Sequence, residues 1–334
     1  MASVMNRAFV PPLDQAIRRP VGATVRTLAG RTMGTTWSAK VAALDVDMPA
    51  VEAAIQGELD RVVAQMSPWE PDSVLSRFNR APADTWLEAP TEFVKVLEHA
   101  LAVAEQTQGA FDPTLGALTA LWGFGPAPFS GAPPAGEEVD RALAASGWRR
   151  VHLEPGRIFQ PGGLVLDLCG IAKGFAVDQA SRAIERMSVS SYLIEIGGEL
   201  RGAGVKPNGQ PWWVELEAPP QAEPETRNLV ALHGLSVATS GGYRRFFEHA
   251  GRRLTHTLSP LDGHPVDDQI VSASVLHRDC MAADAMATAL IAMGAQKARD
   301  FVENAGISAL IVMKTEGGFE DLNSSAMNEL LRDG

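Results

Sequence analysis

The order in which helix-like and strand-like patterns follow one another most constrains the fold of this chain. Apolar residues recur with helical spacing in the segments 49–66, 90–109, 137–146, 170–187, 279–290 and 295–306. Stretches typical of strands lie between or beside them, at 31–44, 150–154, 163–168, 191–205, 211–219, 236–242, 268–276 and 308–313. Helices and strands are therefore mixed without strict βαβ alternation and without an internal repeat. This order predicts an α+β, or mixed α/β, fold.

Composition places the chain among ordinary globular proteins. Of its 334 residues, 46% are hydrophobic and 21% are charged, which allows one large domain or two smaller ones and excludes a disordered or fibrous protein. The net charge is −11, and the densest basic stretch, "GYRRFFEHAGRRLTH", is interrupted by Glu248. A nucleic-acid-binding protein would carry a basic stripe, so nucleic acid is not an expected partner.

The N-terminal segment contains no uninterrupted apolar stretch, because Pro12, Asp14 and Arg26 break the candidates. We therefore expect no signal peptide, no lipid-attachment cysteine, no transmembrane segment and a cytoplasmic protein. Residues 1–29 are expected to form a poorly ordered extension, followed by one domain over 30–334. The two cysteines, Cys169 and Cys280, allow one disulfide and do not form a disulfide framework.

Asp284 and Thr288 stand four residues apart in "DCMAADAMATAL", a segment that otherwise resembles a buried helix. On a helix this spacing places both side chains on one face, about one turn apart. A carboxylate beside a hydroxyl suits a hard cation such as Mg²⁺, which prefers oxygen ligands and usually retains substrate phosphates. The alternative, which this pattern alone favours, is that Thr288 bonds back into its own helix and Asp284 is a partly exposed charge.

The segment "GGLVLDLCGIAKGFAVD" predicts a strand that ends at Asp167, followed by a glycine and a new helix. Backbone N–H groups at such a junction bind phosphates, and Lys173 adds a cation in the first helical turn. The alternative is a tight strand-to-helix turn with a solvated Lys173. The segment is not a P-loop, because the required glycine and lysine spacing is absent.

Several aromatic residues and one histidine are candidates for a binding site. Phe111 and Trp122 surround Asp112 in a glycine-rich segment and would flank a planar ring, or else form a hydrophobic corner with Asp112 as a helix cap. Trp69 follows a proline and is either a stacking platform or a core residue. His256 ends the strand-like "RLTHTL", and catalytic groups often lie at the ends of such elements.

Taken together and in order, eight segments resemble the landmarks of the ApbE family, the FAD:protein FMN transferases. They are "TMGTTW", "MSPWEPDSVLSRFN", "GAFDPTLGALTALWGFGP", "LDLCGIAKGFAVD", "IEIGGELRGAG", "VATSGGYRRFF", "THTLSPLDGHPV" and "MAADAMATAL". The resemblance runs from about residue 30 to 313, nearly the whole chain. Eight ordered landmarks are far more specific than any one of them.

The resemblance implies a flavin transferase fold, with a T-fold-like core and an additional α/β portion. It also implies binding of FAD and Mg²⁺ and transfer of the FMN moiety to a Thr or Ser hydroxyl of a target flavoprotein, with release of AMP. Some members of the family instead hydrolyse FAD to FMN and AMP. A flavoprotein that carries the acceptor hydroxyl is thus the implied partner, and by implication it is cytoplasmic or presents its acceptor on the cytoplasmic side of a membrane.

The resemblance also assigns roles to single residues. It implies that His256 is catalytic and that Gly170, through its backbone carbonyl, joins Asp284 and Thr288 as metal ligands. The residues implied to contact FAD are Met33, Trp69, Ala110, Phe111, Asp112, Asp167, Lys173 and Leu258.

Two positions depart from the family pattern. Ser259 stands where the family often has Asp or Asn, and Gly242 replaces the Asp of "GDYR". Both departures affect acceptor handling rather than FAD binding. Two other functions remain open from the sequence: an FAD pyrophosphatase with water as acceptor, and a non-catalytic FAD-binding protein.

Overall fold

A single antiparallel sheet organises the computed structural model, which describes residues 5–12, 19–44, 46–127, 129–219 and 226–332. The eight strands of this sheet lie in the order β16-β15-β14-β11-β8-β7-β3-β2. Their bounds are β2 (Thr24–Thr32), β3 (Thr35–Ala43), β7 (Tyr192–Ile196), β8 (Glu199–Ala203), β11 (Leu235–Gly241), β14 (Ile270–His277), β15 (Ala309–Thr315) and β16 (Gly318–Asn323). The predicted mixture of helices and strands is confirmed.

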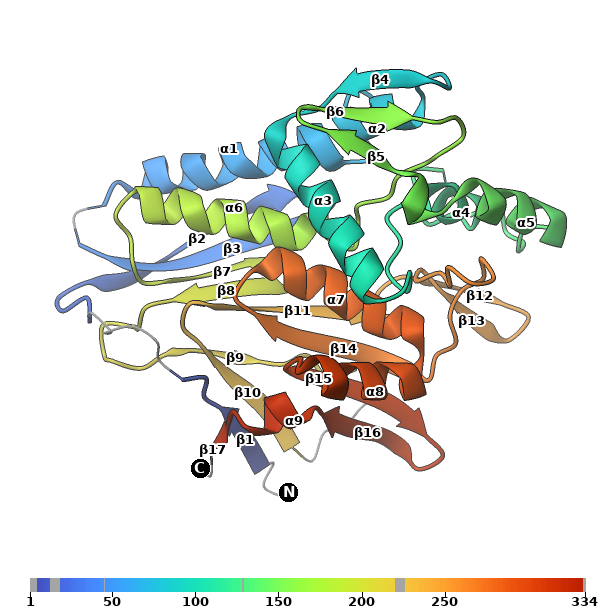
Figure 1. Ribbon diagram of the computed structural model, residues 1–334. Coiled ribbons are helices and arrows are strands. Elements are labelled where there is room, and N and C mark those ends of the chain that lie inside the picture. The colour runs from blue at the N-terminus through green and yellow to red at the C-terminus, as the bar shows by residue number, and fades with distance from the viewer. Residues whose placement is uncertain (1–4, 13–18, 45, 128, 220–225, 333–334) are drawn as a thin grey trace.

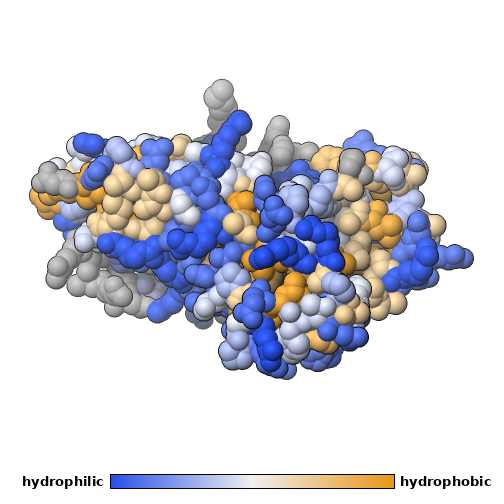
Figure 2. Space-filling view, turned by 90° about the horizontal axis from the view of Figure 1, so that it is seen from above, coloured by the Kyte–Doolittle hydropathy of each residue, from blue (hydrophilic) through white to orange (hydrophobic). Residues whose placement is uncertain are grey.

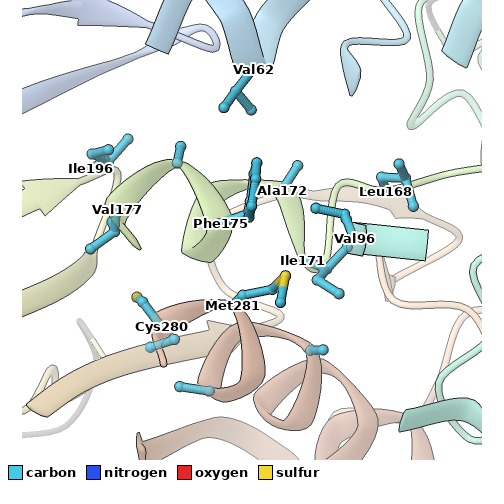
Figure 3. Close-up of a cluster of buried hydrophobic side chains, with 14 of the residues drawn as sticks. Val62, Val96, Leu168, Ile171, Ala172, Phe175, Val177, Ile196, Cys280 and Met281 are labelled. Atoms are coloured by element: carbon cyan, nitrogen blue, oxygen red, sulfur yellow. The ribbon is translucent and has the colours of Figure 1, made fainter. Parts of the chain in front are cut away.

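One face of the sheet is covered by helices, most of which lie above it in Figure 1. They are α1 (Met48–Met66), α3 (Thr91–Gln106), α6 (Ala172–Arg186), α7 (Cys280–Met293) and α8 (Ala295–Ala305). In α1, Val51, Ile55 and Leu59 are buried at helical spacing, and the Asp47 side chain accepts a hydrogen bond from the backbone N of Ala50 to cap the helix. Side chains from α1, α3, α6 and α7 meet in one hydrophobic core, which includes Val62, Val96, Phe175 and Met281 (Figure 3).

The opposite face of the sheet packs against a second, smaller sheet. This sheet has the order β17-β1-β10-β9, with β1 (Met5–Phe9), β9 (Trp212–Glu215), β10 (Thr226–Leu232) and β17 (Leu331–Arg332). Strand β15 shows why both faces are apolar: Ile311 faces the helices, whereas Leu310 and Val312 belong to the core against the small sheet. Side chains alternate across a strand, so a continuously apolar strand must be covered on both sides.

Most of the remaining elements lie around the helix layer, whereas α9 (Ser325–Asn328) lies on the side of the small sheet (Figure 1), where its Met327 joins the core against that sheet. A three-stranded sheet of β4 (Thr85–Glu88), β6 (Arg157–Gln160) and β5 (His152–Glu154) lies at the top of Figure 1. Seen from that side, hydrophobic side chains are exposed in a recess near the middle of the molecule, with hydrophilic side chains around it (Figure 2). The other elements are α2 (Val74–Asn79), α4 (Gly116–Leu121), α5 (Gly136–Ala145), a 3-10 turn at Trp148–Arg150, and the hairpin of β12 (Phe246–His249) and β13 (Arg252–Thr255).

The predicted strand at 163–168 is wrong. Only Val165 forms an isolated bridge there, with Leu115. The side chain of Asn79 instead accepts a hydrogen bond from the Leu166 backbone N (2.8 Å) and donates one to its carbonyl oxygen (2.9 Å). Side chains thus satisfy backbone groups that a neighbouring strand would otherwise pair.

Two expectations concern the ends of the chain. Of the predicted N-terminal extension, residues 1–4 and 13–18 lie outside the described residues, Met5–Phe9 forms β1, and β2 begins at Thr24. The domain boundary at residue 30 stays a prediction. Within the described ranges, no helix combines the length and apolar character that crossing a bilayer requires.

Candidate functional site

Asp284 lies at the contact between helices α6 and α7. Its side chain is 2% exposed, and its Oδ2 accepts a hydrogen bond from the backbone N of Gly174 (2.8 Å), in the first turn of α6. Its other oxygen, Oδ1, makes no hydrogen bond to the part of the chain that the structure describes. Burial raises the pKa of Asp284, and the nearby charge of Lys173 opposes this shift. The alternative that Asp284 is a partly exposed charge is therefore wrong.

Thr288 lies next to Gly170, at the loop that leads into α6. A Cβ added to Gly170 would lie 2.9 Å from Thr288 Oγ1 and 3.4 Å from the ring of Phe111, so a larger residue here would require Thr288 to shift. The Thr288 hydroxyl is 3.1 Å from Ser240 Oγ at the end of β11, and either hydroxyl can donate. Thr288 therefore bonds to a neighbouring strand, and the alternative of a bond back into its own helix is not realised.

Lys173 is ion-paired with Glu199, the first residue of β8, and its side chain is about one-third exposed (32%). The alternative of a solvated Lys173 is therefore wrong. Burial alone would lower the pKa of Lys173, but the carboxylates of Glu199 and Asp284 together raise it. Burial also raises the pKa of Glu199 to about 7, although the ammonium of Lys173 acts in the opposite direction.

His256 follows strand β13. Its Nδ1 is 3.1 Å from the carbonyl oxygen of Arg245, and because a carbonyl only accepts, Nδ1 carries the proton. Nε2 is then the unprotonated ring nitrogen. Burial lowers the pKa of His256 to about 4, and the hydrogen bond to the Arg245 carbonyl opposes this shift only in part. At neutral pH the ring is therefore uncharged and able to accept a proton.

Ala110, Phe111 and Asp112 lie in a segment beside the loop that contains Gly170. Phe111 is buried and close to Gly170, and Ala110 is half-buried directly before it. Asp112 Oδ1 accepts hydrogen bonds from the backbone N (2.8 Å) and the hydroxyl (2.6 Å) of Thr114, and Oδ2 accepts one from the backbone N of Trp148. Burial raises the pKa of Asp112, and the Thr114 hydroxyl acts against this shift. Asp112 thus orders the loop that precedes α4.

Two other predicted contacts are part of a hydrophobic cluster. Trp122 is buried and donates its Nε1–H to the carbonyl oxygen of Gly263 (2.8 Å), in agreement with the hydrophobic corner that was the alternative to a ring beside a ligand. Leu258 is 5% exposed and belongs to the same cluster, which also includes Leu118 and Phe124. Phe124 also lies edge-on to the His256 ring, at 6.3 Å between centroids.

The remaining predicted residues lie in turns. Met33 has a φ of 49° in the turn between β2 and β3, and its side chain packs against the main core. Trp69 is half exposed (48%), and the guanidinium of Arg245 lies 5.9 Å from its ring centroid. Asp167 Oδ1 accepts a hydrogen bond from the Cys169 backbone N (2.8 Å), which shapes the loop before Gly170.

Four residues of this region were not predicted from the sequence. Glu199 pairs with Lys173, Ser240 bonds Thr288, Arg245 contacts both His256 and Trp69, and Asp178 holds the start of α7. The only sequence signal for Glu199 was its place after two glycines in "IEIGGEL". These glycines form a tight turn, after which β8 pairs with the preceding strand β7. The other three depend on contacts between distant segments.

The oxygen groups at the α6–α7 contact are suited to a hard cation. Asp284 Oδ1 is unpaired in the described structure, and the Thr288 hydroxyl and the Gly170 backbone adjoin one another. No cluster of three or more His, Cys, Asp or Glu side chains occurs among the described residues, so a cation here would use one carboxylate with neutral oxygens. A separate groove of about 580 Å³, lined by Trp86, His152 and Phe159, contains none of the predicted site residues.

Comparison with known proteins gives consistent results. Residues 33–311 match the model of the ApbE family. A Vibrio cholerae protein named FAD:protein FMN transferase is 33% identical over 91% of this chain and 92% of its own length. A Haemophilus influenzae protein of the same name is 33% identical over 92% and 91%. The apo crystal structure of the Pseudomonas stutzeri flavinyl transferase ApbE superimposes with a TM-score of 0.87 at 33% identity, covering 93% of this chain and 98% of that one.

Proposed function

Because the chain belongs to the ApbE family, we propose that it transfers the FMN moiety of FAD to a Thr or Ser hydroxyl of an acceptor flavoprotein. The reaction forms a phosphoester between FMN and the acceptor, and AMP leaves. The observation that carries the proposal is the meeting of Asp284, Thr288 and Gly170 at the N-terminal turn of α6, beside Lys173. This arrangement combines oxygen ligands for a cation with a positive charge, as a diphosphate substrate requires.

We further propose Mg²⁺ as the cation, held by Asp284 Oδ1, the Thr288 hydroxyl and the Gly170 carbonyl. Bound Mg²⁺ would neutralise diphosphate charge and make the phosphorus more electrophilic. Lys173 supplies a second positive charge near the same phosphates. Its ion pair with Glu199 restricts where the ammonium lies, so the positive charge does not have to reorganise during the reaction.

His256 is the proposed general base. In the transfer step, the acceptor oxygen forms a bond to the FMN phosphorus, and the bond from that phosphorus to the oxygen of the AMP phosphate breaks. The acceptor proton moves to Nε2 of His256, which is unprotonated because Nδ1–H is directed at the Arg245 carbonyl. Burial lowers the pKa of His256, so the ring is neutral at pH 7 and Nε2 has a lone pair available.

The decisive experiment is intact-protein mass spectrometry of a flavoprotein fragment that bears the acceptor Thr. The fragment is incubated with this protein, FAD and Mg²⁺. A mass gain of one FMN on the fragment, lost when the acceptor Thr is changed to Ala, is expected. A second incubation without acceptor tests the hydrolytic alternative: rapid release of FMN and AMP into water, with no gain on the fragment, would contradict transfer. FAD binding without either reaction would indicate a non-catalytic FAD-binding protein.

A further inference from the structure

Glu199 is a buried carboxylate in the candidate site whose hydrogen bonds are incomplete. It begins β8 directly after Gly197 and Gly198, which have φ values of 60° and 105° and form the turn from β7. Its side chain is 1% exposed. Arg244 holds the turn by donating a hydrogen bond to the Gly197 carbonyl oxygen (2.8 Å). The position of Glu199 is therefore set by the backbone of a fixed turn.

The two oxygens of Glu199 have different surroundings. Oε1 accepts from the Lys173 ammonium, whereas Oε2 is buried and has no hydrogen-bond partner among the described residues. An unpaired buried carboxylate oxygen is costly, and such groups in native proteins call for a specific explanation. Glu58 is another buried carboxylate, but both of its oxygens are paired. Its Oε1 pairs with Arg186 (2.5 Å) and its Oε2 with Arg61 (2.9 Å).

The surroundings of Oε2 define the kind of group that would pair with it. The Lys173 ammonium bound to Oε1 favours the ionised carboxylate, whose Oε2 can only accept hydrogen bonds, so the partner of Oε2 must be a donor. Lys173 lies beside both Glu199 and Asp284, which places Glu199 near the proposed diphosphate site. The phosphates of FAD have no donor at neutral pH, but the two groups attached to them, the ribityl chain and the adenosine ribose, both carry hydroxyl groups, and ADP contains only the second.

We infer that Glu199 is a further FAD-binding residue, which holds Lys173 with Oε1 and accepts a hydrogen bond from a ribityl hydroxyl of FAD with Oε2. The inference rests on the proposed function, since it requires FAD in this site. Glu199 touches both the ligand and the lysine that neutralises the phosphates. It would distinguish FAD from nucleotides that contain the same adenosine and phosphates but lack the ribityl chain.

The test compares the Kd values of FAD and ADP in the presence of Mg²⁺. ADP carries adenosine and two phosphates but no ribityl chain. A hydrogen bond to a charged group contributes about 1.5 kcal/mol or more, so Glu199→Leu is expected to weaken FAD binding about tenfold or more. The Kd of ADP should change less than about threefold. Glu199→Gln keeps a hydrogen-bonding group of the same size and should bind FAD more tightly than Glu199→Leu.

Three outcomes would overturn the inference: unchanged FAD binding in Glu199→Leu, equal losses for FAD and ADP, or equal FAD affinities of the Leu and Gln variants. Equal losses would mean that Glu199 acts through Lys173 or on the adenosine ribose, which ADP shares, and not on the ribityl chain. Glu58→Leu is the matched control, since it removes a buried carboxylate whose oxygens are both paired, and its FAD Kd should equal that of the unaltered protein. If the unaltered protein itself fails to bind FAD, the proposed function fails instead.

Discussion

Asp178 and Asp284 cap each other's helices. Asp284, on α7, accepts a hydrogen bond from the Gly174 backbone N of α6, while Asp178, on α6, accepts from the backbone N of Cys280 (3.0 Å) and of Met281 (3.0 Å) at the start of α7. Neither helix has a capping hydrogen bond from its own N-cap side chain. The N–H of Gly174 in α6 and those of Cys280 and Met281 in α7 are thus satisfied by a carboxylate of the other helix, which fixes the position of Asp284 in the site.

Replacing Asp178 tests this reciprocal arrangement. Asp178→Ala leaves two buried backbone N–H groups of α7 without a partner, and loss of such a cap costs about 1–3 kcal/mol. We expect the free energy of unfolding, measured by urea denaturation, to fall by about that amount. Asp279→Ala is the matched control, because Asp279 is the N-cap of α7 in sequence but its side chain makes no capping hydrogen bond. Equal losses in both variants would contradict the arrangement.

Gly174 sets how closely α6 and α7 approach. A Cβ added there would lie 2.8 Å from Asp284 Cβ and closer still to the carbonyl of Cys280, which is too near for either atom. Gly174→Ala should therefore force the helices apart, lower the melting temperature and weaken Mg²⁺-dependent FAD turnover.

Gly57 provides the control for this change. It also lies inside a helix, α1, and an added Cβ would meet nothing within 4 Å. Since alanine is the better helix former, Gly57→Ala should raise the free energy of unfolding by about 0.5–1 kcal/mol without changing turnover. A Gly174→Ala protein with unaltered melting temperature and turnover would show that the close approach of the two helices is unimportant.

His256 is expected to affect transfer more than binding. Its ring approaches the site from β13, and removal of a general base typically slows a reaction about 10²–10⁴-fold. His256→Ala should therefore retain the FAD Kd, measured by flavin fluorescence, while the rate of FMN transfer falls by about 10² or more. Loss of FAD binding in this variant would instead make His256 a ligand contact or a structural residue.

The lowered pKa of His256 predicts a pH dependence of stability. In the unfolded chain a histidine titrates near 6.5, whereas burial lowers the pKa of His256 to about 4 in the folded protein. Between these values the unfolded state binds the proton more tightly, so this residue makes the folded state less stable as pH falls from about 6.5 to 4. Urea unfolding at pH 7 and pH 5 should show a smaller loss for His256→Gln than for the unaltered protein. Equal losses would contradict the assigned shift.

The sequence predicted best those features that depend on local pattern. The helices around 49–66, 170–187 and 279–290 follow from apolar spacing, and α7 was expected to carry Asp284 and Thr288 on one face. The strand at 163–168 was wrong because Asn79, far away in the sequence, pairs with the backbone of Leu166. Apolar residues in this segment are buried, as in a strand, but the segment pairs with another described part of the chain only through the single bridge of Val165 with Leu115.

Contacts between segments that are far apart in the sequence could not be predicted from local sequence patterns. For an isolated helix it was reasonable to expect a partly exposed Asp284 and a Thr288 bonded to its own helix. Both expectations were wrong because Asp284 pairs with Gly174 of α6 and Thr288 with Ser240 of β11. Similarly, nothing in the spacing around Trp122 indicated that Gly263 would accept its N–H. The roles that the family resemblance implied for single residues, including Mg²⁺ ligation, stay predictions until a complex is determined.

The most direct test is a crystal structure of the protein with FAD and Mn²⁺, whose anomalous scattering locates the ion that replaces Mg²⁺. The proposed function predicts an anomalous peak in contact with Asp284 Oδ1, Thr288 Oγ1 and the carbonyl oxygen of Gly170, with the FAD diphosphate beside it. A diphosphate bound away from α7, or a peak that does not contact Asp284, would contradict the account.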